Sequence, residues 1–69
     1  MTFKIDDMRD ELNKALTHPD WSWAYFRVLS EAARDAMDVL LVIDNHPLAY
    51  QPGSRETRFR KLHNAKHQF

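Results

Sequence analysis

The chain has 69 residues, with ten basic and ten acidic side chains, no cysteine and a formal net charge of zero. A chain of this length forms one domain at most and buries only about 60% of its unfolded surface, so self-association is an expected source of stability. The lack of cysteine excludes disulfides and thiolate metal sites. The longest apolar run, 39–43, is far below the roughly 20 residues that span a bilayer. We therefore expect a cytoplasmic protein that does not enter membranes.

Charge is divided unevenly along the chain. Residues 1–45 hold nine acidic and five basic side chains, a net −4, whereas residues 46–69 hold one acid and five bases, a net +4. A basic segment attracts phosphates or acidic protein surfaces, and an acidic segment repels nucleic acid. The division therefore indicates a binding role rather than a particular chemistry.

The first predicted helix covers residues 5–18. Its apolar residues are three or four positions apart, which places them on one face: Ile5, Met8, Leu12, Ala15 and Leu16. Asp6 and Asp7 suit the positive end of the helix dipole. This segment is predicted to be a short amphipathic helix.

A long helix is predicted over residues 19–44, because Pro19 suits a first helical turn and neither glycine nor proline occurs from Trp21 to Ile43. Its apolar residues form two neighbouring faces. One face holds Trp21, Tyr25, Val28, Ala32, Ala36, Val39 and Ile43. The other holds Phe26, Leu29, Ala33, Met37, Leu40 and Leu41. So broad an apolar surface needs more than one partner helix.

The solvated side of the long helix is predicted to carry two ion pairs. Arg27 and Glu31 are four residues apart, as are Arg34 and Asp38. Such pairs stabilise a helix by about 0.2–0.5 kcal/mol each.

Residues 45–53 are predicted to form a loop, since they contain Pro47, Pro52 and the only glycine. A basic helix is predicted over residues 54–66, with Ser54 as its cap and a thin core face of Phe59 and Leu62. The whole chain, 1–69, is thus expected to be a single all-α domain of two or three helices. It would consist of a helical hairpin and a basic C-terminal helix, completed by oligomerisation.

The basic helix combines cations with aromatic rings, as sites for phosphates and bases do. The candidate binding residues are Arg55, Arg58, Arg60 and Lys61, with Phe59 among them and Tyr50 just before. They predict binding of nucleic acid or a cyclic nucleotide. The same residues are equally compatible with packing against the acids of residues 1–45, in the same chain or in a neighbouring copy.

Four aromatic residues lie within residues 21–26: Trp21, Trp23, Tyr25 and Phe26. One helix cannot hide all of them on one side, although most are expected in the core. Trp21 and Trp23 are therefore candidate contacts for a protein partner, since tryptophan is enriched at interface hot spots.

Two histidine patterns are candidates for metal binding or catalysis. His63 and His67 lie four apart with Glu56 two turns earlier, but a lasting zinc site takes four ligands, so we predict no metal. The spacing of Arg58 and His63 resembles the Arg-x-x-x-x-His motif of a superfamily of metal-independent helical ribonucleases. That resemblance implies His63 as acid or base and Arg58 as phosphate ligand, although Phe59 replaces the usual polar residue. The sequence has no glycine-rich loop that could bind a phosphate. It also lacks the usual residues for nucleophilic catalysis.

The segment Pro52-Gly53-Ser54-Arg55-Glu56, followed by Lys61, Leu62 and Ala65, resembles the closing helix of small phage anti-CBASS sponges. The resemblance implies a helical oligomer that sequesters cyclic nucleotides, and it assigns no binding residue here. We expect a non-enzymatic, homo-oligomeric binding protein without cofactor, a phage-type accessory or inhibitor that occupies the surface of a host or defence protein. The alternatives are a binder or sponge of nucleic acid or cyclic nucleotides through the basic helix and, more remotely, a ribonuclease.

Overall fold

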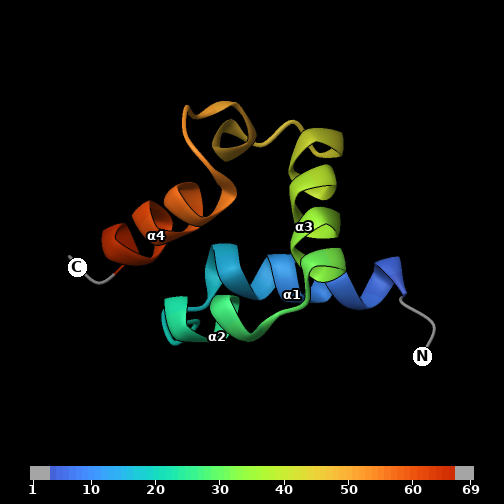
Figure 1. Ribbon diagram of the computed structural model, residues 1–69, viewed down its shortest axis with the longest axis horizontal. Helices are drawn as coiled ribbons and strands as arrows, with labels where there is room; N and C mark the ends of the chain where they lie inside the picture. Colours follow the sequence, from blue (N-terminus) through green and yellow to red (C-terminus); the bar gives the residue numbers. More distant parts are fainter. Residues whose placement is uncertain (1–3, 67–69) are drawn as a thin grey trace.

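The computed structural model describes residues 4–66, which form four α-helices and one 3₁₀ turn (Figure 1). In chain order they are α1 (Ile5–Thr17), α2 (Trp23–Val28), α3 (Glu31–Ile43), η1 (Pro47–Tyr50) and α4 (Arg55–Lys66). The all-α prediction is confirmed, with four helices in the described residues rather than two or three. None of these helices is long and apolar enough to cross a membrane.

The predicted long helix over residues 19–44 is wrong, because the chain is extended at Leu29 and Ser30 (ψ 148° and 160°). The Ser30 side chain accepts a hydrogen bond from the Ala33 N–H at 3.1 Å and thereby caps α3. Ser22 caps α2 in the same way through the Tyr25 N–H at 3.1 Å. Each serine satisfies a backbone donor that a helix start leaves free, so two capped helices replace one.

The other segments lie close to their predicted positions. α1 and α4 each differ from the predicted helix by one residue at one end, and η1 lies within the predicted loop. α3 ends where Asn45 takes a left-handed conformation (φ 53°), and the His46 N–H then donates to the Leu41 carbonyl oxygen at 2.9 Å. This end turns the chain toward η1 and α4.

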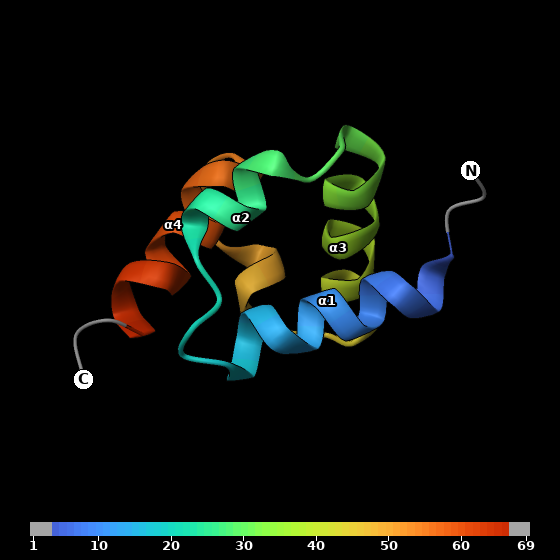
Figure 2. The same ribbon diagram turned by 90° about the horizontal axis from the view of Figure 1, so that it is seen from below.

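The break between α2 and α3 separates the helices into two groups. In both views α2 and α4 lie together at one end of the molecule, while α3 lies at the other end, beside the first half of α1 (Figures 1 and 2). A single core connects the two groups, and its buried members are Leu12, Ala15, Trp21, Phe26, Met37, Leu40, Leu41, Leu48 and Phe59. At its centre the rings of Phe26 and Phe59 stack with 4.6 Å between centroids.

Candidate partner-binding surfaces

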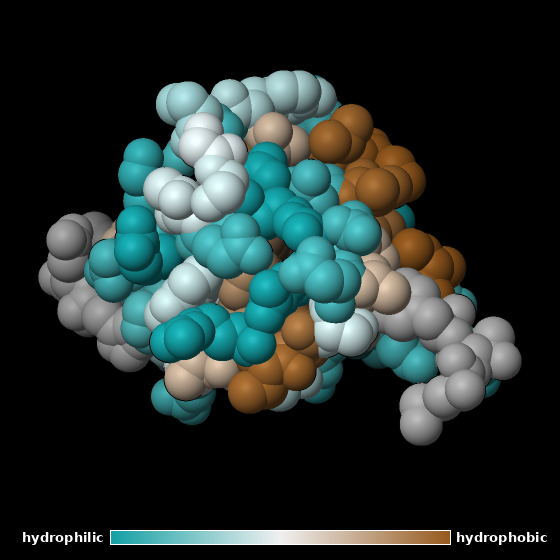
Figure 3. All heavy atoms as spheres, in the orientation of Figure 1, coloured by the Kyte–Doolittle hydropathy of each residue, from teal (hydrophilic) through white to brown (hydrophobic). Residues whose placement is uncertain are grey.

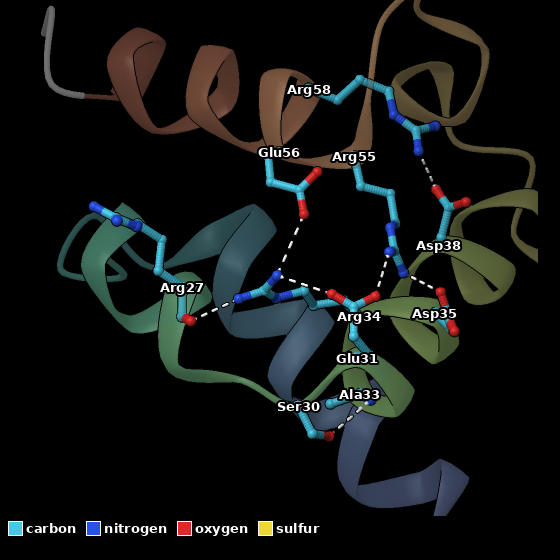
Figure 4. Close-up of polar contacts among 10 residues, drawn as sticks. All are labelled: Arg27, Ser30, Glu31, Ala33, Arg34, Asp35, Asp38, Arg55, Glu56 and Arg58. Carbon is cyan, nitrogen blue, oxygen red and sulfur yellow. Dashed lines mark hydrogen bonds and ion pairs between the residues drawn. The ribbon is translucent and has the colours of Figure 1, made fainter.

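Ion pairs join the start of α4 to one side of α3 (Figure 4). The Nη2 atom of Arg55 donates to Oε2 of Glu31 at 2.8 Å, and its Nη1 atom pairs with Asp35. Because Glu31 and Asp35 are one helical turn apart, their carboxylates meet the same guanidinium. The hydrogen bond and charge of Arg55 lower the pKa of Glu31. Arg55 therefore joins α4 to α3 and stabilises the fold in this conformation.

Arg58 is the next α4 cation to turn toward α3. Its Nη2 atom donates to Oδ1 of Asp38, and its Nη1 atom donates to the Ala49 carbonyl oxygen at 3.1 Å. The residue is only 7% exposed, so it is enclosed by α3, η1 and α4. An enclosed guanidinium needs such partners, since an unpaired buried charge is costly.

Arg34 of α3 also connects separate segments. Its Nη1 atom lies 3.2 Å from Glu31 Oε1 and 3.3 Å from Glu56 Oε1 of α4, and its Nη2 atom donates to the Arg27 carbonyl oxygen at 2.6 Å (Figure 4). The guanidinium carbon also lies 5.3 Å from the centroid of the Phe26 ring. Arg34 thus holds the end of α2 and the start of α4 against α3.

The ion pairs predicted within a long helix do not form. Arg27 and Arg34 were expected to pair with Glu31 and Asp38, four residues later. Instead Glu31 receives Arg34 and Arg55, and Asp38 receives a cation of α4. The helix break displaces Arg27 from the side of α3, and α4 supplies arginines that pair with the acids of α3. Packing of the basic helix on acids of its own chain, one of the two interpretations of the sequence, is what the structure shows for Arg55 and Arg58.

The aromatic residues predicted to contact a partner differ in how far they are exposed. Phe59 is completely buried and Trp21 is 6% exposed, so both are core residues. Trp23 is partly buried and stacks on Phe26, with 5.1 Å between centroids. Only Tyr50 is widely exposed, and its hydroxyl donates to Oδ1 of Asn45 at 3.0 Å.

Arg60 and Lys61 are the candidate cations that remain on the surface. Both are exposed, and neither forms an ion pair within residues 4–66. Lys61 borders a groove of about 390 Å³ between η1 and α4. The groove is lined by His46, Pro47, Leu48, Gln51, Lys61, Leu62 and Ala65. We call it the η1–α4 groove.

The η1–α4 groove has mostly apolar walls and a few polar groups. In its neutral form, His46 accepts the Leu48 N–H through Nδ1 at 3.0 Å, which leaves Nε2 as a hydrogen-bond donor. Lys61 adds a positive charge at the edge. The sequence analysis did not find this groove, whose walls come from residues 46–51 and 61–65.

A second groove, of about 510 Å³, lies between α1 and the start of α2. It is lined by Glu11, Lys14, His18, Asp20, Trp21, Ser22 and Tyr25. Burial, together with the hydrogen bond and charge of Glu11, raises the pKa of Tyr25. Both signs of charge occur here, so its electrostatics favour no single class of ligand.

Lys66 connects the end of α4 to the end of α1. Its Nζ atom donates to the His18 carbonyl oxygen at 3.2 Å. Burial lowers the pKa of Lys66. This contact fixes α4 at its C-terminal end, as Arg55 fixes it at the other.

The structure gives the position of Arg58, one of the residues considered for catalysis. Arg58 is enclosed and bound to Asp38 and Ala49, so its guanidinium is not presented to a phosphate in this conformation. His67 lies outside the described residues. Within residues 4–66, no three histidine or acidic side chains lie close enough together to hold a metal ion.

The outer side of α3 is an apolar surface that no segment of residues 4–66 covers. Val39, Val42 and Ile43 are 52%, 53% and 64% exposed, and Ala32 is also exposed. Ala32, Val39 and Ile43 belong to the first of the two apolar faces in the sequence, while the second face is buried in the core. Part of the apolar surface predicted for residues 19–44 therefore stays exposed in residues 4–66.

Comparison with family models, curated proteins and solved structures finds no match to this chain.

Proposed function

We propose that this chain is a non-enzymatic binding protein of the cytoplasm, an accessory or inhibitor that occupies the surface of a partner protein. The observation that carries the proposal is the η1–α4 groove, with its apolar walls and the charge of Lys61 at its edge. Such a groove suits a short partner segment that carries apolar side chains and a carboxylate.

The distribution of charge supports a protein partner over nucleic acid. Arg55 and Arg58 are held by acids of α3, so their positive charge is balanced within the chain. Arg60 and Lys61 remain exposed, a small number of cations for a chain whose affinity must come from phosphate contacts. An apolar groove with one or two cations instead gives affinity through burial and orientation through charge.

The aromatic cluster has a different role from the one expected. Trp21 and Phe59 are buried in the core, so they do not supply direct contacts to a partner in this conformation. Tyr50 extends from η1 and adds an exposed aromatic ring near the groove-forming residues. Affinity for the partner is therefore assigned to Tyr50, Lys61 and the groove walls.

The proposal is tested by capturing proteins from a lysate of the producing cells and titrating the purified target. Ala65→Arg fills the groove from an exposed position, and Lys61→Glu reverses the charge at its edge. Both variants are expected to weaken binding at least tenfold. Lys4→Glu, on the distant start of the chain, is the matched charge control and should bind normally.

A target that binds Ala65→Arg as tightly as the unmodified chain would overturn the proposal. Recovery of nucleic acid or cyclic nucleotides, with binding lost on changing Arg60 and Lys61, would favour the sponge alternative instead. RNA cleavage that disappears in His63→Ala would restore the ribonuclease alternative.

A further inference from the structure

We infer that pH regulates the η1–α4 groove through His46: the neutral imidazole holds the η1 wall of the groove in place, and protonation releases it. The inference rests on the proposed function of this groove and adds a means by which binding there is switched. His46 is the first lining residue of that wall and directly precedes η1.

The start of η1 depends on one side-chain hydrogen bond. The Nδ1 atom of His46 accepts the Leu48 N–H at 3.0 Å. The neighbouring positions offer no substitute, because Pro47 has no N–H and the Ala49 N–H donates to the His46 carbonyl oxygen at 3.0 Å. Leu48 is only 5% exposed, so water is a poor replacement for the imidazole. His46 therefore acts as the cap of the turn.

Protonation of His46 removes this acceptor. The lone pair on Nδ1 accepts the hydrogen bond, and protonation places a hydrogen atom there, so two donors then face each other. The imidazole has to turn away, and the Leu48 N–H is left without its partner, which is costly for a buried donor. Histidine changes charge between about pH 5 and 8, so this change falls within the physiological range.

The elements around His46 contribute charges of both signs. Lys61 of α4 lines the groove together with His46. Asp44, at the end of α3, pairs through its carboxylate with Arg9 of α1 at 2.8 Å. The turn η1 itself carries no charged side chain. Among residues 4–66, none of those that line the groove is acidic, so the groove offers the protonated imidazole no ion pair in place of the lost hydrogen bond.

The release is confined to the start of η1. The Leu48 side chain stays in the core, and Nη1 of Arg58 donates to the Ala49 carbonyl oxygen at 3.1 Å. The imidazole of His46 and the ring of Pro47 precede these anchored residues, so they move while the rest of the fold remains. Figure 3 shows mostly hydrophilic or near-neutral atoms at the upper end of the molecule, where η1 lies in Figure 1. Water therefore reaches the turn.

Two effects of protonation on partner binding oppose each other. The new positive charge beside Lys61 attracts the carboxylate of a partner segment, but ion pairs at a hydrated surface contribute little. The lost cap displaces part of one wall of the groove, and a buried donor without an acceptor costs more than such an ion pair gains. Binding is therefore expected to be strongest with neutral His46 and to weaken in acid.

Nuclear magnetic resonance tests the switch without a partner. The amide signal of Leu48 is expected to shift between about pH 8 and about pH 5, with the same midpoint as the imidazole signals of His46. In His46→Asn this shift should disappear, because an asparagine oxygen caps the turn throughout this pH range. His18→Asn removes an exposed histidine outside the groove and should leave the Leu48 titration unchanged. A Leu48 amide that does not follow His46 would overturn the inference.

Titration of the purified target measures the effect on binding. The affinity of the unmodified chain is expected to fall about threefold to tenfold between about pH 8 and about pH 5, and that of His46→Asn to change less. Binding that strengthens in acid, or that changes equally for both chains, would overturn the inference. If Leu48 titrates but no target responds to Ala65→Arg, the proposed function fails and the switch in the turn remains. If a target responds to Ala65→Arg but Leu48 does not titrate, the inference alone fails.

Discussion

The guanidinium of Arg58 is nearly enclosed, whereas Asp38, its partner across the α3–α4 contact, keeps about a third of its side chain in solvent (side chains 9% and 34% exposed). The two members of the pair therefore differ in how much they depend on each other. If Asp38 is removed, the enclosed guanidinium loses its counter-charge and cannot turn fully into water. The pair fastens the basic helix to the rest of the fold.

Asp38→Ala is expected to lower the free energy of unfolding by about 2 kcal/mol, because it leaves Arg58 enclosed without its charged acceptor. Urea denaturation followed by circular dichroism measures the change. Asp35→Ala is the matched control, since Asp35 also pairs with an arginine of α4 but is 68% exposed. Its cost should be well under 1 kcal/mol. Equal losses for the two variants would contradict the structural role assigned to Arg58.

Ser30→Ala is expected to destabilise the protein by about 1 kcal/mol, because it removes the side-chain acceptor for the Ala33 N–H at the start of α3. Ser30→Asp keeps a capping oxygen and should retain most of the stability. Thermal unfolding of both variants, monitored by circular dichroism, tests the capped break. A Ser30→Ala variant more stable than the unmodified chain would instead favour a continuous helix.

Acid should weaken the fold partly through Glu31, whose pKa in the folded chain is lowered from its ordinary value of 4.5 by Arg55. A lowered pKa in the folded state contributes stability above pH 4.5, and that contribution disappears as the pH falls through the folded pKa. Glu31→Gln should therefore be less stable than the unmodified chain at neutral pH, and the difference should shrink below pH 4.5. Urea denaturation at several pH values measures it. A difference independent of pH would exclude this linkage.

Any binding to RNA should depend only weakly on salt. Arg60 and Lys61 are exposed, whereas Arg55 and Arg58 are bound to acids, so about two phosphates are neutralised per chain. The slope of the logarithm of affinity against the logarithm of salt concentration should then lie near −1.4 for a single strand, at about −0.7 per phosphate. Fluorescence anisotropy with a labelled oligonucleotide measures the slope. A slope of twice that size would mean that Arg55 and Arg58 leave their acids on binding.

The sequence alone determined the helical class, the positions of α1 and α4 and the excess of apolar surface in residues 19–44. Periodicity and breaking residues act locally, so they can be recognised without knowing which segments meet. The break at Leu29 and Ser30 was missed, because a serine within a helix-forming segment is compatible with both continuation and capping. Packing of α2 on α4 favours a capped break at Ser30 over a continuous helix.

The tertiary structure decided which charged side chains form ion pairs within the chain. Arg58 and Arg60 are equivalent in sequence terms, two cations on one basic helix. In the fold, one is enclosed beside Asp38 and the other lies in solvent. The same holds for the two apolar faces of α3, of which one is buried and the other is exposed except at Ala36. The sequence supplies charges and faces, and only their positions relative to other segments decide which remain for a partner, because burial and ion pairing depend on contacts between distant residues.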